Sequence, residues 1–284
     1  MISQSFEYAA PATLAEALKL IGGGAKPLAG GMSLIPMMKL RLASPDKLVD
    51  IGKLKDLNYI REAAGAIHIG AASTHYEVET SALIRGKCPL LGETAAHIGD
   101  VQVRNMGTIG GSVAHADPSA DYPAALQALE ARIVLKSAKA ERTVSAADFF
   151  VDTFTTALEP GEIVGEVIVP VEGSGVGTSY QKMVQPASGF AIVGVAARIQ
   201  KTGGKIAMAR IGVTGLSNRS FRATACEKAL EGKTGSATEI QNAAALVPQG
   251  VDANGDLFAS ADYRKHLAVV YAARAILAAL ARSA

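Results

Sequence analysis

Two segments of the sequence combine a pair of glycines with neighbouring hydroxyl side chains and carry no charge. The first is Ala-Gly-Gly-Met-Ser at residues 29–33, and the second is Thr-Ile-Gly-Gly-Ser at residues 108–112. Consecutive glycines allow positive φ angles, and they lack the Cβ that would keep a phosphate oxygen away from the backbone. Ser33 is also placed to cap a following helix, whose N-terminus favours an anion. Either segment alone is equally typical of a tight turn, but the pair predicts two backbone loops on the two sides of one pyrophosphate.

Apolar periodicity and turn residues predict helices and strands in a mixed order. We expect helices at residues 14–21, 34–42, 76–85, 90–98, 123–130, 222–230, 236–247 and 262–282, and strands at residues 26–28, 48–51, 57–61, 67–71, 133–136, 142–145, 163–169, 178–184, 190–200 and 205–215. Because strands and helices do not alternate regularly, the expected fold class is α+β rather than a doubly wound parallel sheet. The order predicts two N-terminal subdomains, residues 1–54 and 55–176, and a C-terminal domain, residues 177–284, in which helices pack on a three-stranded sheet.

Length, charge and hydropathy narrow the class of protein. The chain has 284 residues, of which 49% are hydrophobic, so two or more packed units are expected. A net charge of +2, without a basic run interleaved with aromatic residues, argues against nucleic-acid binding. The longest apolar segment, residues 267–281, is broken by Arg274 and is too short to cross a bilayer. No signal peptide is visible at the start of the sequence, so we expect a cytoplasmic protein.

The sequence does not match other phosphate-binding and catalytic motifs, because the residues that they require do not occur at the required spacing. The lysine in residues 24–27, Gly-Ala-Lys-Pro, is not followed by Ser or Thr, which excludes a P-loop there. No G-x-G-x-x-G segment follows a strand and opens a helix, so a Rossmann-type dinucleotide site is not expected. No G-x-S-x-G elbow supports a nucleophile. We therefore predict no catalytic residue in this chain.

The candidate metal ligands are too few or too irregularly spaced. Cys88 and Cys226 lie far apart in the sequence, and we expect two buried free thiols rather than a disulfide. An iron–sulfur cluster needs closely grouped thiolates, so none is expected in this chain. His97, His115 and Asp117 have irregular spacing and no cysteine partner, and loop packing is enough to explain the last two. No metal site is predicted.

Two longer segments carry a family resemblance. Residues 28–42, LAGGMSLIPMMKLRL, and residues 102–125, QVRNMGTIGGSVAHADPSADYPAA, resemble the two flavin signatures of the FAD-binding medium subunits of molybdenum hydroxylases, the xanthine dehydrogenase and carbon monoxide dehydrogenase family. The resemblance covers essentially the whole chain. It implies a flavoprotein fold of the vanillyl-alcohol-oxidase type, with FAD extended between the two N-terminal subdomains. One departure is Met32, where carbon monoxide dehydrogenases of this family usually have His, and this argues against carbon monoxide as the substrate.

The resemblance also implies which residues contact FAD. Both glycine segments are implied pyrophosphate ligands: Ala29, Gly30, Gly31, Met32, Ser33, Thr108, Ile109, Gly110, Gly111 and Ser112. Asp121 matches an acidic position that holds the ribose or nearby hydroxyl groups, and its alternative role is to cap the following helix. Lys182 matches a lysine near the flavin, where a cation favours the anionic reduced form, and its alternative is a solvated surface lysine. Ile98, and Ile163 or Val164, match contacts to the cofactor but are equally typical of core positions.

The implied function is electron transfer within a larger assembly. Electrons released at a molybdopterin cofactor on a large subunit would pass through [2Fe–2S] clusters on a small subunit to FAD in this chain, and then to an external acceptor. The resemblance implies a heterohexamer, a dimer of heterotrimers, with the substrate pocket on the large subunit. The alternatives are a self-sufficient FAD-dependent reductase of the same superfamily and a non-catalytic flavin-binding sensor or assembly protein. Arg104 has two possible roles, as a loop anchor bonded to carbonyls or as a contact with a partner subunit.

Overall fold

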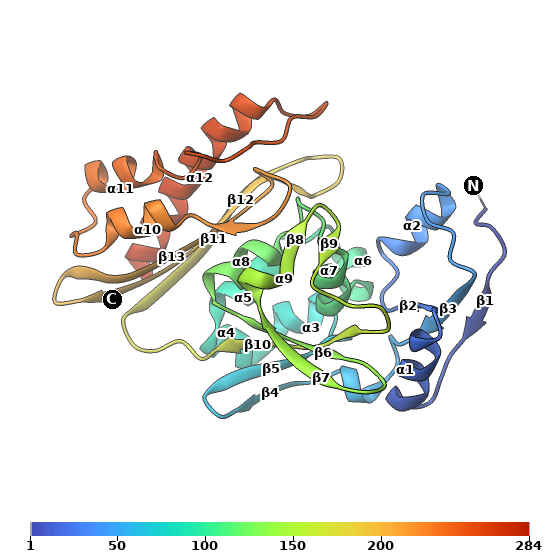
Figure 1. Cartoon of the computed structure of the whole chain (residues 1–284). Helices are drawn as coiled ribbons and strands as arrows, with labels where there is room; N and C mark the ends of the chain where they lie inside the picture. The colour runs from blue at the N-terminus through green and yellow to red at the C-terminus, as the bar shows by residue number, and fades with distance from the viewer. Residues whose placement is uncertain (1, 284) are drawn as a thin grey trace.

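The computed structural model describes residues 2–283, which form three packed units along the chain (Figure 1). The first unit is a small parallel sheet with strand order β1-β3-β2 and two helices. Its elements are β1 (Glu7–Ala9), α1 (Leu14–Gly22), β2 (Lys26–Leu28), α2 (Leu34–Lys39) and β3 (Lys47–Asp50). Apolar residues of α1 recur at helical spacing, so Ala17, Leu18 and Ile21 form one buried face that packs in a cluster with Val49 and Leu57.

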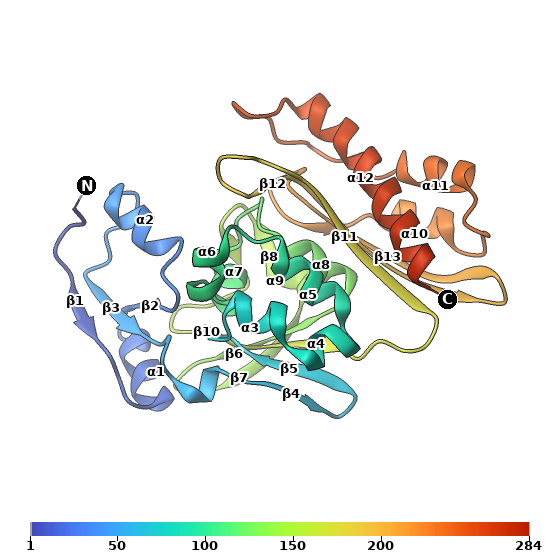
Figure 2. The same ribbon diagram turned by 180° about the vertical axis from the view of Figure 1, so that it is seen from behind.

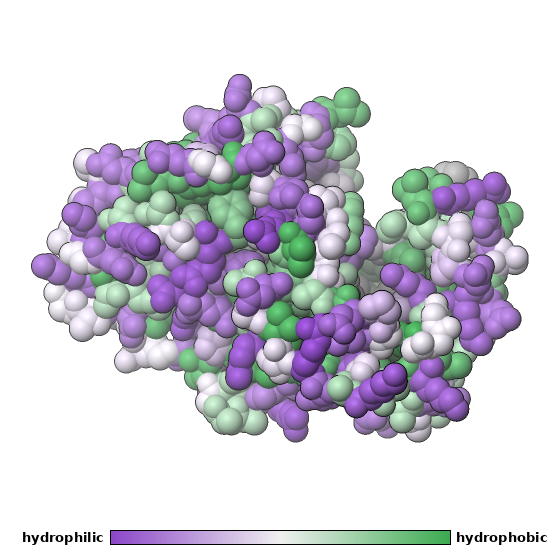
Figure 3. Space-filling model, viewed as in Figure 1, coloured by the Kyte–Doolittle hydropathy of each residue, from purple (hydrophilic) through white to green (hydrophobic). Residues whose placement is uncertain are grey.

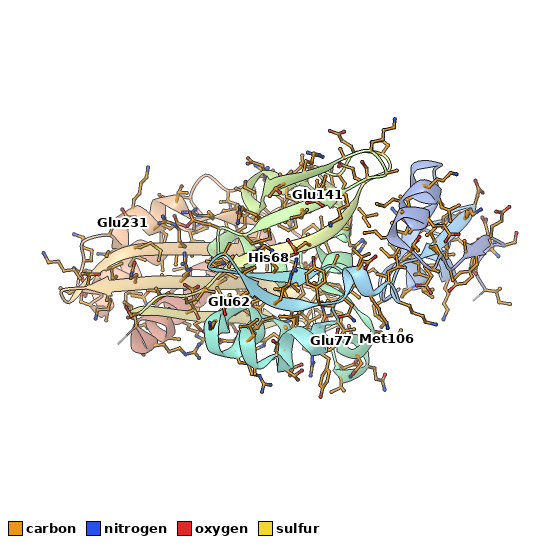
Figure 4. The ribbon with its side chains drawn as sticks, turned by 90° about the horizontal axis from the view of Figure 1, so that it is seen from below. Glu62, His68, Glu77, Met106, Glu141 and Glu231 are labelled. Atoms are coloured by element: carbon orange, nitrogen blue, oxygen red, sulfur yellow. The ribbon has the colours of Figure 1, made fainter. Side chains whose placement is uncertain are left out.

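The middle unit is a five-stranded antiparallel sheet in the order β4-β5-β10-β6-β7. Its strands are β4 (Ile60–Ala63), β5 (Ala66–Gly70), β6 (Arg132–Lys136), β7 (Glu141–Ser145) and β10 (Ile163–Pro170). The helices are η1 (Lys55–Leu57), α3 (His75–Thr80), α4 (Ala82–Lys87), α5 (Pro89–Ala96), α6 (Val101–Met106), α7 (Ile109–His115), α8 (Tyr122–Ala128) and α9 (Ala146–Phe149), and a short hairpin comprises β8 (Phe150–Asp152) and β9 (Thr155–Thr156). Helices α3, α4, α5, α7 and α8 lie on one face of the sheet (Figures 1 and 2). The opposite face is seen from below in Figure 4, where His68 and Glu141 are labelled.

The C-terminal unit is an antiparallel sheet covered by helices on one face. It comprises β11 (Val176–Val184), β12 (Ala191–Thr202), β13 (Lys205–Thr214), β14 (Phe221–Arg222), α10 (Thr224–Leu230), α11 (Ala237–Ala244) and α12 (Ala261–Arg282). Buried residues of the sheet and of α10, α11 and α12 form one hydrophobic cluster. The other face of the sheet rests on α8, and a Cβ at Gly212 would lie 1.9 Å from the Ala124 carbonyl oxygen. A glycine is therefore required where α8 crosses the sheet.

The predicted mixture of helices and sheets is confirmed, but several elements differ from expectation. The predicted three-stranded C-terminal sheet is wrong, because β14 adds a fourth strand by pairing with Gly212 and Val213 of β13. The helix expected at residues 34–42 ends at Lys39, and Arg41 has a φ of 61° that a helix cannot continue through. The single helix expected at residues 76–85 is divided at Ser81, whose side chain caps α4.

The largest local error concerns residues 101–115. No helix was predicted there, and the second glycine segment was expected to be a loop. The structure has α6 and α7 instead, with Thr108 as the N-cap of α7 and both Gly110 and Gly111 in its first turn. Two glycines lower helix propensity enough to hide a short helix that tertiary packing stabilises.

Each unit contains most of one large hydrophobic cluster, but two of these clusters extend across the units through Ile163 and Tyr180. The predicted boundaries near residues 54 and 176 remain a prediction. Cys88 and Cys226 are both free and buried, which confirms the expected thiols. Among residues 2–283, every helix is too short or too polar to traverse a lipid bilayer.

Candidate functional site

The structure brings the first glycine segment into contact with the residues that directly precede the second, between the first and middle units. A Cβ at Gly30 would lie 1.9 Å from the carbonyl oxygen of Met106 and 2.8 Å from the Cα of Gly107, so the two backbones are in contact. Figure 4 shows Met106 at the end of the middle unit that faces the first unit. The surface has a notch between these two units (Figure 3). A site in this notch would be lined by backbone from both segments.

The first segment presents free amide groups. The N–H groups of Gly30, Gly31, Met32 and Ser33 donate to no acceptor within residues 2–283, and Gly31 has a φ of 73°. Successive unpaired N–H groups form an anion-binding concavity. The expected helix cap at Ser33 is wrong, because its side chain makes no capping hydrogen bond to α2. The potential to bind an anion therefore lies in the backbone rather than in the Ser33 hydroxyl.

The second segment is built differently. The amide of Ile109 donates to the Ser73 carbonyl at 3.0 Å, that of Gly110 to the Ala71 carbonyl at 2.9 Å, and that of Gly111 to the Thr108 hydroxyl at 3.1 Å. The expected cradle of free loop amides is therefore wrong for these three residues. The positive φ that the sequence suggested for this glycine pair is wrong as well, since neither glycine has one.

The two glycines of α7 have separate roles. A Cβ at Gly110 would lie 2.3 Å from the Ala71 Cβ, so Gly110 allows α7 to pack against the segment that follows β5. Gly111 is exposed, and a Cβ there would meet only the Thr108 hydroxyl within 4 Å, at 2.8 Å. Ser112 is half-buried and its hydroxyl has no partner within the described residues. Gly111 and Ser112 are the positions of this segment that remain open to a ligand.

Asp121 and Lys182 form a buried ion pair that sequence reasoning missed. The Lys182 ammonium lies 2.9 Å and 3.1 Å from the two carboxylate oxygens of Asp121, and the side chains are 3% and 4% exposed. The Tyr180 hydroxyl also donates to Asp121 at 2.6 Å. A solvated surface role for Lys182 is therefore wrong, and so is a capping role for Asp121, whose side chain makes no cap hydrogen bond.

The charge state of this pair follows from its surroundings. Burial raises the pKa of Asp121 to about 6, and the opposing effects of Lys182 and of the Tyr180 hydrogen bond keep the pKa from rising further. The contacts with the Lys182 ammonium and the Tyr180 hydroxyl favour the ionised form of the carboxyl group. Because one carboxylate accepts bonds from β11 at two positions, it joins the C-terminal sheet to the start of α8.

Arg104 anchors the loop that contains Ile98. Its guanidinium donates to the Ile98 carbonyl at 3.2 Å and pairs with Glu79 at 2.7 Å. The loop-anchor role is thus confirmed. Ile98 is half-buried and packs against the core of the middle unit. The side chain of Ile163 is only 3% exposed, in the core shared with α1, so any contact with a ligand would have to be made by its backbone.

Two further features near α7 carried no sequence signal. Phe154, between β8 and β9, has a φ of 51° and is 55% exposed, and its ring lies 5.0 Å from that of His115. His75 is buried beside Gly107, and its Nδ1 has no hydrogen-bond partner in the described chain. Within residues 2–283, no group of three or more His, Cys, Asp or Glu side chains is arranged to hold a metal ion.

The chain is similar to known proteins over its full length. Residues 4–172 match the family model of the FAD binding domain in molybdopterin dehydrogenase, and residues 178–279 match that of the CO dehydrogenase flavoprotein C-terminal domain. The glyceraldehyde dehydrogenase medium chain of Sulfolobus acidocaldarius is 38% identical, with 97% of this chain and 98% of that chain covered. The carbon monoxide dehydrogenase medium chain of Hydrogenophaga pseudoflava is 39% identical, with 100% of both chains covered. A solved structure of carbon monoxide dehydrogenase from that organism superposes with a TM-score of 0.97 at 41% identity, over 100% of both chains.

Proposed function

Because the chain belongs to the family of FAD-binding medium subunits of molybdenum hydroxylases, we propose that it holds FAD in the notch between its first and middle units and relays electrons through it. The two N-terminal units would then be the two subdomains of a flavoprotein fold of the vanillyl-alcohol-oxidase type. Bound FAD supplies the capacity to accept electrons from one centre and deliver them to another. The chain's own residues bind the cofactor, orient it and separate it from water.

The row of unpaired amides at Gly30–Ser33 supports this proposal most directly. A pyrophosphate carries negative charge and many acceptor oxygens, and it suits a concavity of N–H donors. Gly111 and Ser112 would face the same group from α7, where the lack of a side chain at Gly111 leaves room for it. Thr108, Ile109 and Gly110 would shape the second segment rather than donate to the ligand, since the amides of Ile109 and Gly110 already have partners. Ala29 would begin the first segment, directly before the unpaired amides.

The other proposed site residues surround the remainder of the cofactor. Ile98, on the loop held by Arg104, would contribute an apolar surface, and the backbone at Ile163 would approach the ring from β10. Asp121 and Lys182 would contribute as a buried pair next to that loop, since Lys182 also donates to the His97 carbonyl. In this proposal the site would be lined by segments from all three units.

The proposed electron donors and acceptors lie outside this chain. Cys88 and Cys226 are buried in two different hydrophobic clusters and cannot jointly ligate an iron–sulfur centre. We therefore place [2Fe–2S] clusters on a small subunit and the molybdopterin cofactor on a large subunit, in a dimer of heterotrimers. Electrons would enter the FAD of this chain from the clusters and leave to an external acceptor.

The proposal is tested by comparing two glycines with similar backbone strain. Gly31 and Gly24 both have positive φ, 73° and 96°. A Cβ at Gly31 would lie 2.9 Å from the Cγ1 of the flexible Ile35 side chain, whereas a Cβ at Gly24 would meet nothing within 4 Å, so only Gly31→Ala is expected to shift the unpaired amides of the first segment. Replacement by Ala strains either position by roughly 1 kcal/mol. We expect Gly31→Ala to weaken FAD binding and Gly24→Ala to leave it unchanged, as measured by fluorescence titration of the FAD-free chain.

The wild-type chain should bind one FAD without a covalent link. Acid precipitation should therefore release all flavin into the supernatant. A yellow pellet would contradict non-covalent binding, and equal FAD affinity in the two glycine variants would contradict the role given to the first segment.

A further inference from the structure

The Lys182 ammonium bonds to three separate segments of the chain. It pairs with Asp121 at 2.9 Å, donates to the His97 carbonyl at 2.7 Å and donates to the Gly189 carbonyl at 2.7 Å. A lysine ammonium has three hydrogens to donate. All three are thus occupied by protein acceptors, and Lys182 has no hydrogen left for a direct bond to a ligand.

The three segments belong to different parts of the fold. Asp121 precedes α8 in the middle unit, and His97 follows α5 as its C-cap, immediately before Ile98. Gly189 lies in the turn between β11 and β12 of the C-terminal unit. The backbones of Gly189 and Gly99 are in close contact, because a Cβ at Gly189 would be 3.2 Å from the Cα of Gly99. Lys182 therefore lies at the point where the C-terminal turn contacts the loop that carries Ile98.

The residues around the Asp121–Lys182 pair leave room for its hydrogen bonds. Tyr180 is fully buried, and its hydroxyl would be 2.3 Å from a Cβ at Gly194 on the adjacent strand. A glycine at position 194 therefore makes room for the hydroxyl that bonds to Asp121. Removing one member of a buried ion pair leaves the other charge without a partner, whereas removing both charges together is often tolerated.

We propose that Lys182 is a positioning residue, a latch that fixes residues 185–190 of the C-terminal unit against residues 97–99 and so forms one wall of the cofactor cleft. The inference rests on the proposed FAD site but differs from a direct role for Lys182 at the flavin. In the latch, the charge of Lys182 is neutralised by Asp121, and its effect on FAD is transmitted through the position of the Ile98 loop. Loss of the latch should loosen both segments even before FAD is added.

The test uses the full chain and four variants: Lys182→Met, Asp121→Asn, the double variant, and Lys205→Met as an exposed lysine control on the same sheet. Hydrogen exchange of peptides covering residues 97–99 and 185–190 is measured in the FAD-free protein, and the rate of FAD loss is measured separately. Each single variant should accelerate exchange in both segments on the order of 100-fold or more, as loss of one partner of a buried pair implies. The double variant should restore much of the protection, and Lys205→Met should match the wild type.

The reduction potential of bound flavin separates the latch from a direct electrostatic role. If Lys182→Met shifts the potential while exchange in both segments stays at the wild-type rate, the latch is overturned. Independent effects of Lys182→Met and Asp121→Asn on exchange would overturn it too. If the wild-type chain binds no FAD but the exchange results are as expected, the latch stands and the proposed FAD function fails instead.

Discussion

His75 is a buried residue whose charge state limits the pH range over which the fold is stable. Burial, with a smaller contribution from Arg104, lowers its pKa to about 4, and its ring lies 5.3 Å from that of Tyr122. In the unfolded chain its pKa is about 6.5. Between these two pH values the unfolded state binds more protons than the folded state, so the free energy of unfolding rises with pH.

The contribution of His75 to stability is therefore complete above about pH 6.5 and lost as pH falls towards 4. The shift corresponds to roughly 3 kcal/mol. Urea denaturation at a series of pH values should show this loss in the wild type and in His266→Gln, which changes an exposed histidine. In His75→Gln the slope between pH 6.5 and 4 should be smaller. An unchanged slope would show that other groups govern acid stability.

Helix α7 combines a packing glycine with an open glycine in one turn. Gly110→Val would place a side chain against Ala71, where a Cβ would already be 2.3 Å from the Ala71 Cβ. Overpacking of this kind lowers the free energy of unfolding by roughly 1–3 kcal/mol. Gly111→Val should keep the fold, because Gly111 is exposed, but should empty the FAD site.

Denaturant titration and flavin content measured on the same samples separate these two effects. We expect Gly110→Val to shift the denaturation midpoint strongly. Gly111→Val should show a midpoint near that of the wild type, with at most a small loss from displacement of the Thr108 hydroxyl, and should contain little FAD. Wild-type flavin content in Gly111→Val would mean that α7 contributes only packing to the site.

At the scale of the whole molecule, the proposed cofactor site depends on contacts between all three units. The proposed FAD site lies between the first and middle units, and Thr214 of the C-terminal sheet donates from its hydroxyl to the carbonyls of Pro118 and Ala120, both at 2.8 Å. The segment between α7 and α8 is thus held by the C-terminal unit. In this arrangement the three units together would position the proposed flavin.

Because the iron–sulfur clusters and the molybdopterin cofactor are proposed to lie on partner subunits, the purified chain with FAD is expected not to oxidise the substrate of its complex. Chemical reduction by dithionite should still bleach the flavin, and activity should appear when the large and small subunits are added back. The measurement is the steady-state rate with an aldehyde, a purine and another N-heterocycle, for the chain alone and for the reconstituted complex. Turnover by the chain alone at the rate of the complex would falsify the electron-relay function.

Several helices, strands and glycine segments could be predicted from the sequence, because they follow from local chemistry. Alternating and helical apolar patterns located most elements, such as the β6–β7 pair and the long final helix α12, because these elements bury a face whose periodicity is set by backbone geometry. The glycine pairs located the two segments near the notch. A glycine pair indicates a place where the backbone makes a close approach, but it does not indicate which neighbouring group the backbone approaches.

Only the tertiary structure decided what each of these residues does. Gly110 and Gly111 are adjacent residues of the same type, but Gly110 packs against Ala71 and Gly111 is exposed. Asp121 and Lys182 are distant in the chain and become a buried pair because the C-terminal sheet rests on the start of α8. The sequence by itself determined the family, the mixed fold and the glycine segments, since these follow from local pattern and motif. The direction of each side chain and the partner of each amide depend on contacts between distant segments, and such contacts exist only once the chain has packed.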